Sequence, residues 1–222
     1  MSLHLIVGPM FSGKSGEIMG IIRKYKSAGY PYLVITHKFD TAYNFSKNKN
    51  KSGSKNKNKT LKSNKSGLRG NSIPFPSIAV ENFSGIRKVE DFAKARLVII
   101  KETQFFRNLK DFVLDCVEKF GKHVVCVGLD GDSDRNKFGE ILDLIPYCDS
   151  VEKRNSICAR GPDPHPAPFT RRKGHNKNTL LPGGKEIYEA LCRKHYLEEV
   201  ALDKKDKRPL KKEDEAKGSE VK

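Results

Sequence analysis

The 222-residue sequence lacks any apolar run approaching 18 residues, and it lacks an N-terminal basic segment followed by an apolar stretch. The first absence argues against a membrane-spanning helix, and the second gives no support for secretion. We therefore expect an intracellular, cytoplasmic protein that does not contact a membrane.

Cysteine is scarce, and its five residues are an odd number, which does not suit a framework of paired disulfides. Three of them, Cys116, Cys126 and Cys148, stand in apolar surroundings, where a free thiol usually acts as a small hydrophobic side chain. Cys158 and Cys192 have different surroundings, rich in charged and turn-forming residues.

Apolar residues make up only 36% of the chain and the mean hydropathy is −0.61, so part of the length is not expected to form a core. Residues 44–70 contain eight Lys, one Arg and no acid, and they contribute +9 of the net charge of +16. We interpret this segment as a disordered, low-complexity insert, bounded at 44–71. It is either a solvated Asn/Lys expansion without a partner or a basic arm for nucleic acid or an acidic surface. Because no aromatic residues interleave for base stacking, a nucleic-acid partner is disfavoured.

The C-terminal segment 198–222 holds eight acidic and eight basic residues and few apolar ones. It is expected to be a disordered, charged tail.

Short β-branched apolar runs alternate with segments of helical periodicity along the first two thirds of the chain. Strands are expected at residues 3–7, 32–36, 96–101 and 123–129. A helix is expected between the first two strands and another over residues 109–121. This alternation predicts an α/β domain with a parallel sheet covered on both faces by helices.

The composition changes after about Tyr147 and becomes rich in Pro, Gly, Arg and His. This change indicates a small second subdomain, in which residues 185–195 are the only evident helix candidate.

The segment GPMFSGKS directly follows the first expected strand and opens the first expected helix, and it matches the pattern GxxxxGK[ST]. In such a loop the backbone N–H groups point at phosphate oxygens, the Lys14 ammonium reaches the β- and γ-phosphates, and the Ser15 hydroxyl binds magnesium. The sequence therefore predicts a nucleotide-binding P-loop formed by Gly8, Pro9, Met10, Phe11, Ser12, Gly13, Lys14 and Ser15.

Several segments together resemble the type II thymidine kinase family, of the cellular and poxviral kind. The similar pieces are GPMFSGKS (8–15), KFDTAY (38–43), KETQFF (101–106), LDGDSDRNKFGEILDLIP (129–146) and PGGKEIYEALCRKHY (182–196). They cover most of residues 3–196 and leave the insert and the tail outside. The resemblance implies a P-loop NTPase-like α/β domain (1–147), a lasso and zinc-binding subdomain (148–197), and a tetrameric assembly.

The resemblance also implies the catalytic groups. Glu102 matches the general base that accepts the proton of the nucleoside 5′-hydroxyl during its attack on the γ-phosphate of ATP. Asp40 matches a carboxylate near the metal, so Ser15 and Asp40 are the expected magnesium ligands. The residues alone leave other interpretations open, since Glu102 could cap the next helix and Asp40 could be a turn residue.

Four residues match positions that the family uses at the nucleoside, namely Phe105, Phe106, Thr170 and Tyr188. Thr170 resembles the start of the lasso loop, which covers the nucleoside and contributes mainly backbone contacts. Buried core packing is the competing interpretation for the two phenylalanines, and an amphipathic helix stripe is the competing one for Tyr188.

Cys158, Cys192 and His195 resemble three quarters of the family's structural zinc site, whose pattern is CxxC followed by CxxC or CxxH. Gly161 stands at the position of the missing ligand, and His165 could replace it if the intervening turn bends back. A complete zinc site and a pair of free thiols both remain open at this point.

The chain departs from the family at four positions. Lys101 replaces an acid before the catalytic Glu, Ala42 replaces an Arg, Ser133 replaces a Phe that stacks on the pyrimidine, and Gly16 replaces a Thr. These changes support an alternative hypothesis of a catalytically impaired nucleotide-binding or regulatory protein. The principal hypothesis is a thymidine kinase that converts ATP and thymidine to dTMP and ADP with Mg2+, and that carries structural Zn2+.

Overall fold

The computed structural model describes residues 1–40, 77–173 and 183–206. Predictions for the insert at 44–71, for Ala42 and for the chain beyond residue 206 lie outside the described residues.

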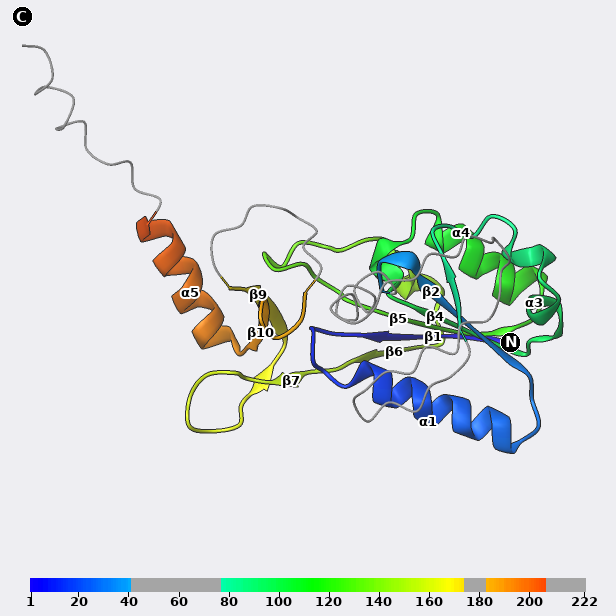
Figure 1. The fold of residues 1–222 in the computed structure, drawn as a ribbon, viewed down its shortest axis with the longest axis horizontal. Coiled ribbons are helices and arrows are strands. Elements are labelled where there is room, and N and C mark those ends of the chain that lie inside the picture. Colours follow the sequence, from blue (N-terminus) through cyan, green and yellow to red (C-terminus); the bar gives the residue numbers. More distant parts are fainter. Residues whose placement is uncertain (41–76, 174–182, 207–222) are drawn as a thin grey trace, which may run out of the picture.

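The centre of the fold is a six-stranded sheet with the order β3-β2-β4-β5-β1-β6, in which every pairing is parallel (Figure 1). Its strands are β1 (Ser2–Val7), β2 (Tyr32–His37), β3 (Ile78–Val80), β4 (Leu97–Lys101), β5 (His123–Gly128) and β6 (Ser150–Lys153). Because all strands run in one direction, the segments that follow them meet at one edge of the sheet.

Helices cover both faces of this sheet, with α1 (Lys14–Ser27) on one face and α3 (Glu90–Lys94) and α4 (Leu109–Leu114) on the other (Figure 1). A π-helical turn, Asp115–Lys119, continues α4, and 3-10 helices occupy Ile86–Lys88, Thr103–Phe105 and Ile141–Tyr147. In the described part of the chain no helix combines the length and apolar character needed to cross a membrane.

Alternate residues of the central strands supply the two halves of the core. In β4, Leu97 and Ile99 pack with the α1 side, whereas Val98 and Ile100 join the cluster under α3 and α4. Strand β5 is buried on both faces in the same way, and one of its residues, Cys126, is fully buried. These continuous apolar runs confirm the predicted parallel sheet covered on both faces.

The buried cysteines confirm their predicted role as apolar core residues. Cys116 and Cys126 are both fully buried in the cluster under α4, and burial raises the pKa of the Cys116 thiol to about 12. All five cysteines are free thiols.

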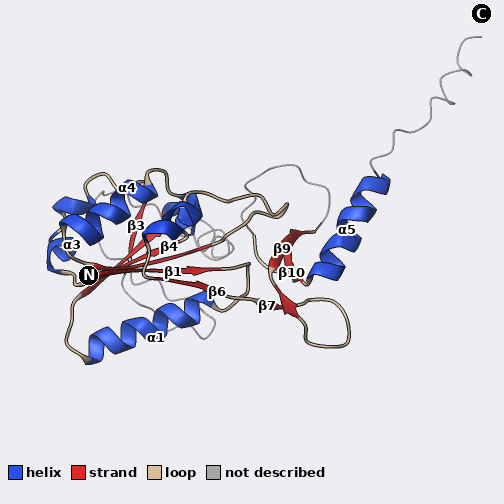
Figure 2. Ribbon diagram, turned by 180° about the vertical axis from the view of Figure 1, so that it is seen from behind, coloured by secondary structure: helices blue, strands red, loops and turns tan. Residues whose placement is uncertain are grey.

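A small second unit follows β6 and contains two short antiparallel pairs and the last helix (Figure 2). Its elements are β7 (Ser156–Ile157), β8 (Pro166–Ala167), β9 (Phe169–Arg172), β10 (Tyr188–Leu191) and α5 (Arg193–Asp206). A separate apolar cluster that includes Ala167, Leu191 and Tyr196 forms its interior.

Two predictions for this region are wrong. Residues 185–195 do not form one helix, because Tyr188–Leu191 is a strand paired with β9 and the helix begins only at Arg193. The charged segment from residue 198 is not a frayed tail at its start, because α5 continues through it to Asp206. Pairing with β9 and burial of Ala190 and Leu191 in the small core override the helical periodicity.

Candidate active site at the carboxyl edge of the sheet

The predicted P-loop lies between β1 and α1, at the carboxyl edge of the sheet. Its backbone needs glycine at two points, since Gly8 and Gly13 have φ values of +148° and +78°. A Cβ atom at Gly8 would lie 2.4 Å from the carbonyl oxygen of Arg154, so no side chain fits there. Ser15 is exposed in the first turn of α1.

Lys14 fills the centre of this loop. Its ammonium donates to the carbonyl oxygens of Gly8 (3.0 Å) and Pro9 (2.6 Å) and to the Ser12 hydroxyl (3.2 Å). Burial lowers the pKa of Lys14 from 10.5 to about 8, against the opposing effect of the nearby Glu102 and Asp130 charges. The loop thus holds a desolvated cation directed inward, ready to meet an anionic ligand.

Contacts with Thr170 and Arg154, which the sequence did not predict, hold the loop and the start of α1 against the chain beyond β6. The Met10 N–H donates to the Thr170 hydroxyl of β9 at 2.9 Å. The Arg154 guanidinium donates to the Ser12 carbonyl at 3.1 Å and to the Glu17 carboxylate at 2.8 Å. These contacts join residues more than 130 positions apart in the sequence, which explains why local patterns gave no signal for them.

Glu102 follows β4 at the same edge and has a left-handed backbone, with φ 53° and ψ 42°. The Gln104 amide N–H donates to its carboxylate at 2.8 Å, and the Gln104 amide oxygen accepts from the Leu129 N–H at 3.1 Å. Gln104 is only 5% exposed. A Cβ atom at Gly128 would lie 2.7 Å from its amide oxygen, so the tight packing fixes this side chain in place. Sequence reasoning placed Gln104 within a family motif but gave it no role.

Lys101 and Asp40 form an ion pair between the ends of the neighbouring strands β4 and β2. The Lys101 ammonium lies 3.3 Å from the Asp40 carboxylate, which also accepts from the Thr36 hydroxyl at 3.0 Å. Both side chains are mostly buried, at 14% and 28% exposed. Lys101, which replaces an acid of the family pattern, therefore neutralises the charge of Asp40, the carboxylate predicted to bind magnesium.

The four predicted nucleoside residues do not share one environment. Phe106 is 2% exposed and packs in the main core against Phe83, whereas Phe105 is half-buried and lies beside His37 and Phe39. Phe105 is therefore the phenylalanine available at the site margin. Thr170 is buried, with its hydroxyl engaged by Met10, and Tyr188 lies half-buried on β10.

The loop after β5 is attached to the second unit. Ser133 is 9% exposed, and its carbonyl oxygen accepts from the Tyr196 hydroxyl at 3.0 Å. The Arg171 side chain, 8% exposed, donates to Asp134 of this loop and to Asp203 of α5. Ser133 is thus held by the second unit through its backbone.

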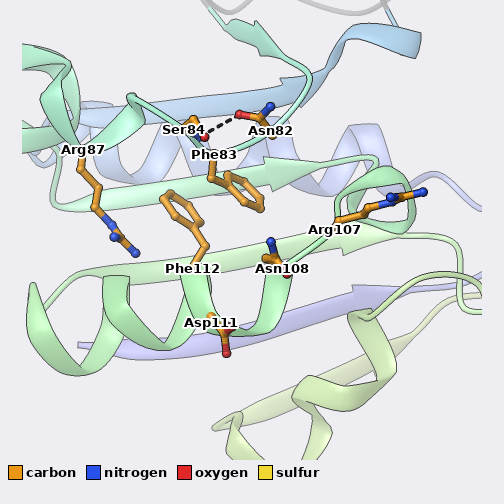
Figure 3. A pocket seen from close by; sticks show the side chains of 8 residues that line it. All are labelled: Asn82, Phe83, Ser84, Arg87, Arg107, Asn108, Asp111 and Phe112. Carbon is orange, nitrogen blue, oxygen red and sulfur yellow. Dashed lines mark hydrogen bonds between the residues drawn. The ribbon is translucent and has the colours of Figure 1, made fainter.

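Figure 3 shows a pocket on the α4 face, where Phe83 and Phe112 stack with ring centroids 4.0 Å apart. The pocket encloses about 240 Å³ and is lined by Asn82, Phe83, Ser84, Arg87, Arg107, Asn108, Asp111 and Phe112. None of the predicted site residues lines it, so the candidate active site is defined by the loops at the sheet edge.

A second cluster of functional side chains lies between β7 and the start of α5. The Nδ1 atom of His195 is 3.3 Å from the sulfur of Cys158 and 3.3 Å from the sulfur of Cys192. The three donor atoms all lie within 4.8 Å of one another, and two sulfurs with an imidazole suit a divalent zinc-type ion. Backbone N–H groups of His195 and Lys194 lower the pKa of the Cys192 thiol, which favours the thiolate that binds metal.

The structure does not place His165, the possible replacement ligand, among the donors of this cluster. Among the described residues the group of neighbouring donors contains only Cys158, Cys192 and His195. His165 is exposed, and its contact with the cluster is made by its backbone, whose carbonyl oxygen accepts from the Cys158 N–H at 2.9 Å.

Comparison with known proteins gives an independent view of the chain. The thymidine kinase family model matches residues 1–196. Thymidine kinase a of Arabidopsis thaliana is 32% identical over 221 residues, which cover 97% of this chain and 83% of the plant protein. The thymidine kinase of Myxoma virus (strain Uriarra) is 29% identical over 194 residues, covering 87% of this chain and 95% of the viral one. The cytosolic thymidine kinase of Homo sapiens is 31% identical over 200 residues, covering 90% and 74%.

The family match spans the P-loop, the strand that presents Glu102 and the unit that carries the Cys/His cluster. It is consistent with the parallel sheet flanked by helices and with the inward-facing Lys14 at the carboxyl edge. The chain therefore belongs to the thymidine kinase family and is a kinase.

Proposed function

We propose that the protein transfers the γ-phosphate of ATP to the 5′-hydroxyl of thymidine, giving dTMP and ADP. The observation that carries the proposal is the position of two groups at the same carboxyl edge of the sheet, Lys14 in the loop after β1 and Glu102 directly after β4. One group meets anionic phosphate and the other accepts a proton, which are the two tasks of phosphoryl transfer to a hydroxyl.

In this proposal Glu102 takes the proton of the attacking hydroxyl, and Gln104 keeps its carboxylate directed into the site. The P-loop, Gly8 to Ser15, surrounds the phosphates with backbone N–H groups other than those of Pro9, which has none, and Met10, whose N–H is bonded to Thr170. Lys14 neutralises the charge that develops on the transferred group. The names of the relatives support thymidine as the nucleoside.

The proposed magnesium ligands are Ser15 and Asp40, whose oxygen donors are the type that Mg2+ prefers. The ion would neutralise phosphate oxygens and hold them for in-line transfer. Ser15 is exposed beside Lys14 and fits this role, whereas Asp40 is already paired with Lys101 and must share its carboxylate. The Lys101 pair is therefore expected to weaken magnesium binding.

The proposed nucleoside contacts are Phe105, Thr170 and Tyr188, with the lasso strands β9 and β10 beside the substrate. The prediction for Phe106 is not kept, because its ring is 2% exposed and packs in the main core. The bond between Thr170 and Met10 brings the lasso strand β9 against the P-loop, which supports this arrangement. Zn2+ at Cys158, Cys192 and His195 is proposed to hold the ends of this region together.

Three broader proposals rest on the family and its relatives. The division into 1–147 and 148–197 is proposed from the family resemblance, but the change of architecture comes after residue 153, because β6 still belongs to the parallel sheet. A tetramer is proposed from the family resemblance. A cytoplasmic location is proposed from the name of the cytosolic human relative.

The direct test is magnesium-dependent formation of dTMP from ATP and thymidine by the purified chain, beside a Glu102→Gln variant. That variant keeps the side-chain shape and the neighbouring amide but cannot accept the proton. We expect turnover by the parent and a loss of about 100-fold or more in the variant. If neither protein forms dTMP while both still bind ATP, the alternative hypothesis of an impaired nucleotide-binding protein replaces the kinase mechanism.

A further inference from the structure

The Cys/His cluster has three donor side chains, and Gly161, which has no side chain, lies next to it. Gly161 lies beside His195, since a Cβ atom at this glycine would stand 3.1 Å from the Cε1 atom of the imidazole. The Nε2 atom of the same ring is 3.8 Å from that Cβ position, and neither cluster sulfur lies within 4 Å of it. Position 161 therefore lies beside the imidazole of the cluster, and it supplies no donor.

The Cys158 side of the cluster is closed by protein, whereas Cys192 and His195 are half-exposed. Cys158 is 9% exposed and packs with Ala167, Leu191 and Tyr196 in the interior of the small unit. The Cys192 N–H donates to the sulfur of Cys158 at 3.2 Å, which holds the two thiols at a fixed spacing.

The side next to Gly161 is open to solvent. Residues 161–166 are all exposed, and Gly161 has a φ of +93°, a backbone conformation that disfavours any other residue. A small ligand can thus approach the cluster beside Gly161, where the described residues provide no fourth protein donor.

Structural zinc sites use four protein ligands, whereas sites with three protein ligands keep a fourth position for water or another small donor. We propose that the cluster binds Zn2+ through Cys158, Cys192 and His195 with an exchangeable fourth ligand, water or a small neutral or anionic donor such as imidazole, beside Gly161. This inference rests on the proposed zinc binding, but it is independent of the proposed kinase activity.

The test uses the full-length protein with Co2+ in place of Zn2+, because the visible spectrum of Co2+ reports the identity and number of its ligands. Imidazole is then added as the exogenous donor. We expect one Co2+ per chain and a saturable spectral change with imidazole. A spectrum that imidazole leaves unchanged at every concentration would overturn the open position, and no Co2+ or Zn2+ binding at all would overturn the zinc proposal itself.

A set of variants at position 161 separates ligation from backbone strain. Gly161→Cys offers a fourth thiolate, and Gly161→Ala introduces the same Cβ atom and the same strain without a donor. Since loss of even an outer partner of a metal ligand costs about 10- to 100-fold in affinity, a new thiolate should raise zinc affinity by about tenfold or more. It should also abolish the imidazole response, whereas Gly161→Ala should keep that response.

Zinc affinity is measured by competition with a chromogenic chelator, and His165→Ala serves as the second control. Unchanged affinity and imidazole response in His165→Ala are expected from the exposed position of that side chain. If His165→Ala instead weakens zinc binding about tenfold or more, His165 is the fourth ligand and the open position is refuted. The imidazole titration of the parent protein does not depend on whether the Gly161→Cys variant folds.

Discussion

Replacement of Lys14 by Met is expected to stabilise the free protein while it removes phosphate binding. The Lys14 ammonium is desolvated among the carbonyl oxygens of Gly8 and Pro9, and burial is the main cause of its lowered pKa. A charged group whose environment disfavours the charge lowers the stability of the fold at every pH where it stays protonated. Met keeps most of the apolar stem and carries no charge.

The magnitude follows from the two pKa values of Lys14. The difference between 10.5 in the unfolded chain and about 8 in the fold corresponds to about 3 kcal/mol at neutral pH. Loss of the amine's hydrogen bonds to the loop offsets part of this gain. We therefore expect Lys14→Met to raise the free energy of unfolding by about 1–3 kcal/mol near pH 7.

The pH dependence of the unfolding free energy separates the contribution of Lys14 from those of other groups. Between the folded pKa of about 8 and the unfolded value of 10.5, the unfolded chain binds more protons at Lys14, so stability rises with pH. From about pH 7 to about pH 9 the parent should gain about 1.4 kcal/mol relative to Lys14→Met. Urea unfolding of the ligand-free proteins at both pH values measures the gain. Lys26→Met, on an exposed position of the same helix, is the matched control.

Two results would refute this reasoning. One is a Lys14→Met variant less stable than the parent at pH 7, because it would mean that the ammonium stabilises the empty loop. The other is a difference in unfolding free energy that does not change with pH. ATP affinity gives a separate check, since the parent should bind ATP more weakly as the pH rises past 8 and Lys14→Met should bind it weakly throughout.

Three further changes have defined outcomes. Gln104→Leu removes a hydrogen bond to the Glu102 carboxylate. In steady-state assays kcat should therefore fall about 10- to 100-fold, with little change in the KM for ATP. An unchanged kcat would contradict the proposal that Gln104 positions Glu102. Lys101→Met releases Asp40 from its ion pair and should lower, several-fold, the Mg2+ concentration that gives half-maximal activity; an unchanged requirement would place magnesium elsewhere. Ile100→Ala opens a cavity at a fully buried position of β4 and should lower the free energy of unfolding, measured in urea, by about 2–5 kcal/mol. A loss below about 1 kcal/mol would contradict the tight packing of this position.

The sequence predicted the elements that carry strong local patterns. Strands β1, β2, β4 and β5 lie within a residue or two of the expected ranges, because each is an apolar run buried on both faces. The two outer strands were not predicted. Strand β3 has only three residues, and all four residues of β6 are exposed, so neither has a pattern that distinguishes it from a loop.

In the candidate site, too, the sequence predicted the residues of local motifs but not the contacts between distant segments. Lys14 and Ser15 belong to a contiguous motif, and Glu102 to a recognisable segment, so the sequence alone was sufficient to propose them. Gln104 and Arg154 act through contacts that form only when separate strands meet at one edge of the sheet. No single-sequence pattern encodes such contacts, and the same holds for the ion pair of Lys101, whose partner lies 61 positions away.

The hydrogen bond between the Met10 N–H and the Thr170 hydroxyl makes the second unit a structural support of the P-loop. Thr170 lies on β9, which pairs with β10, and β10 ends directly before Cys192. A molecule in which this small unit separated from the sheet would lose that support. If the loop binds ATP as proposed, the apparent ATP affinity would scale with the fraction of molecules in which the unit is docked, and a mutation in α5 would change nucleotide binding without any contact to ATP.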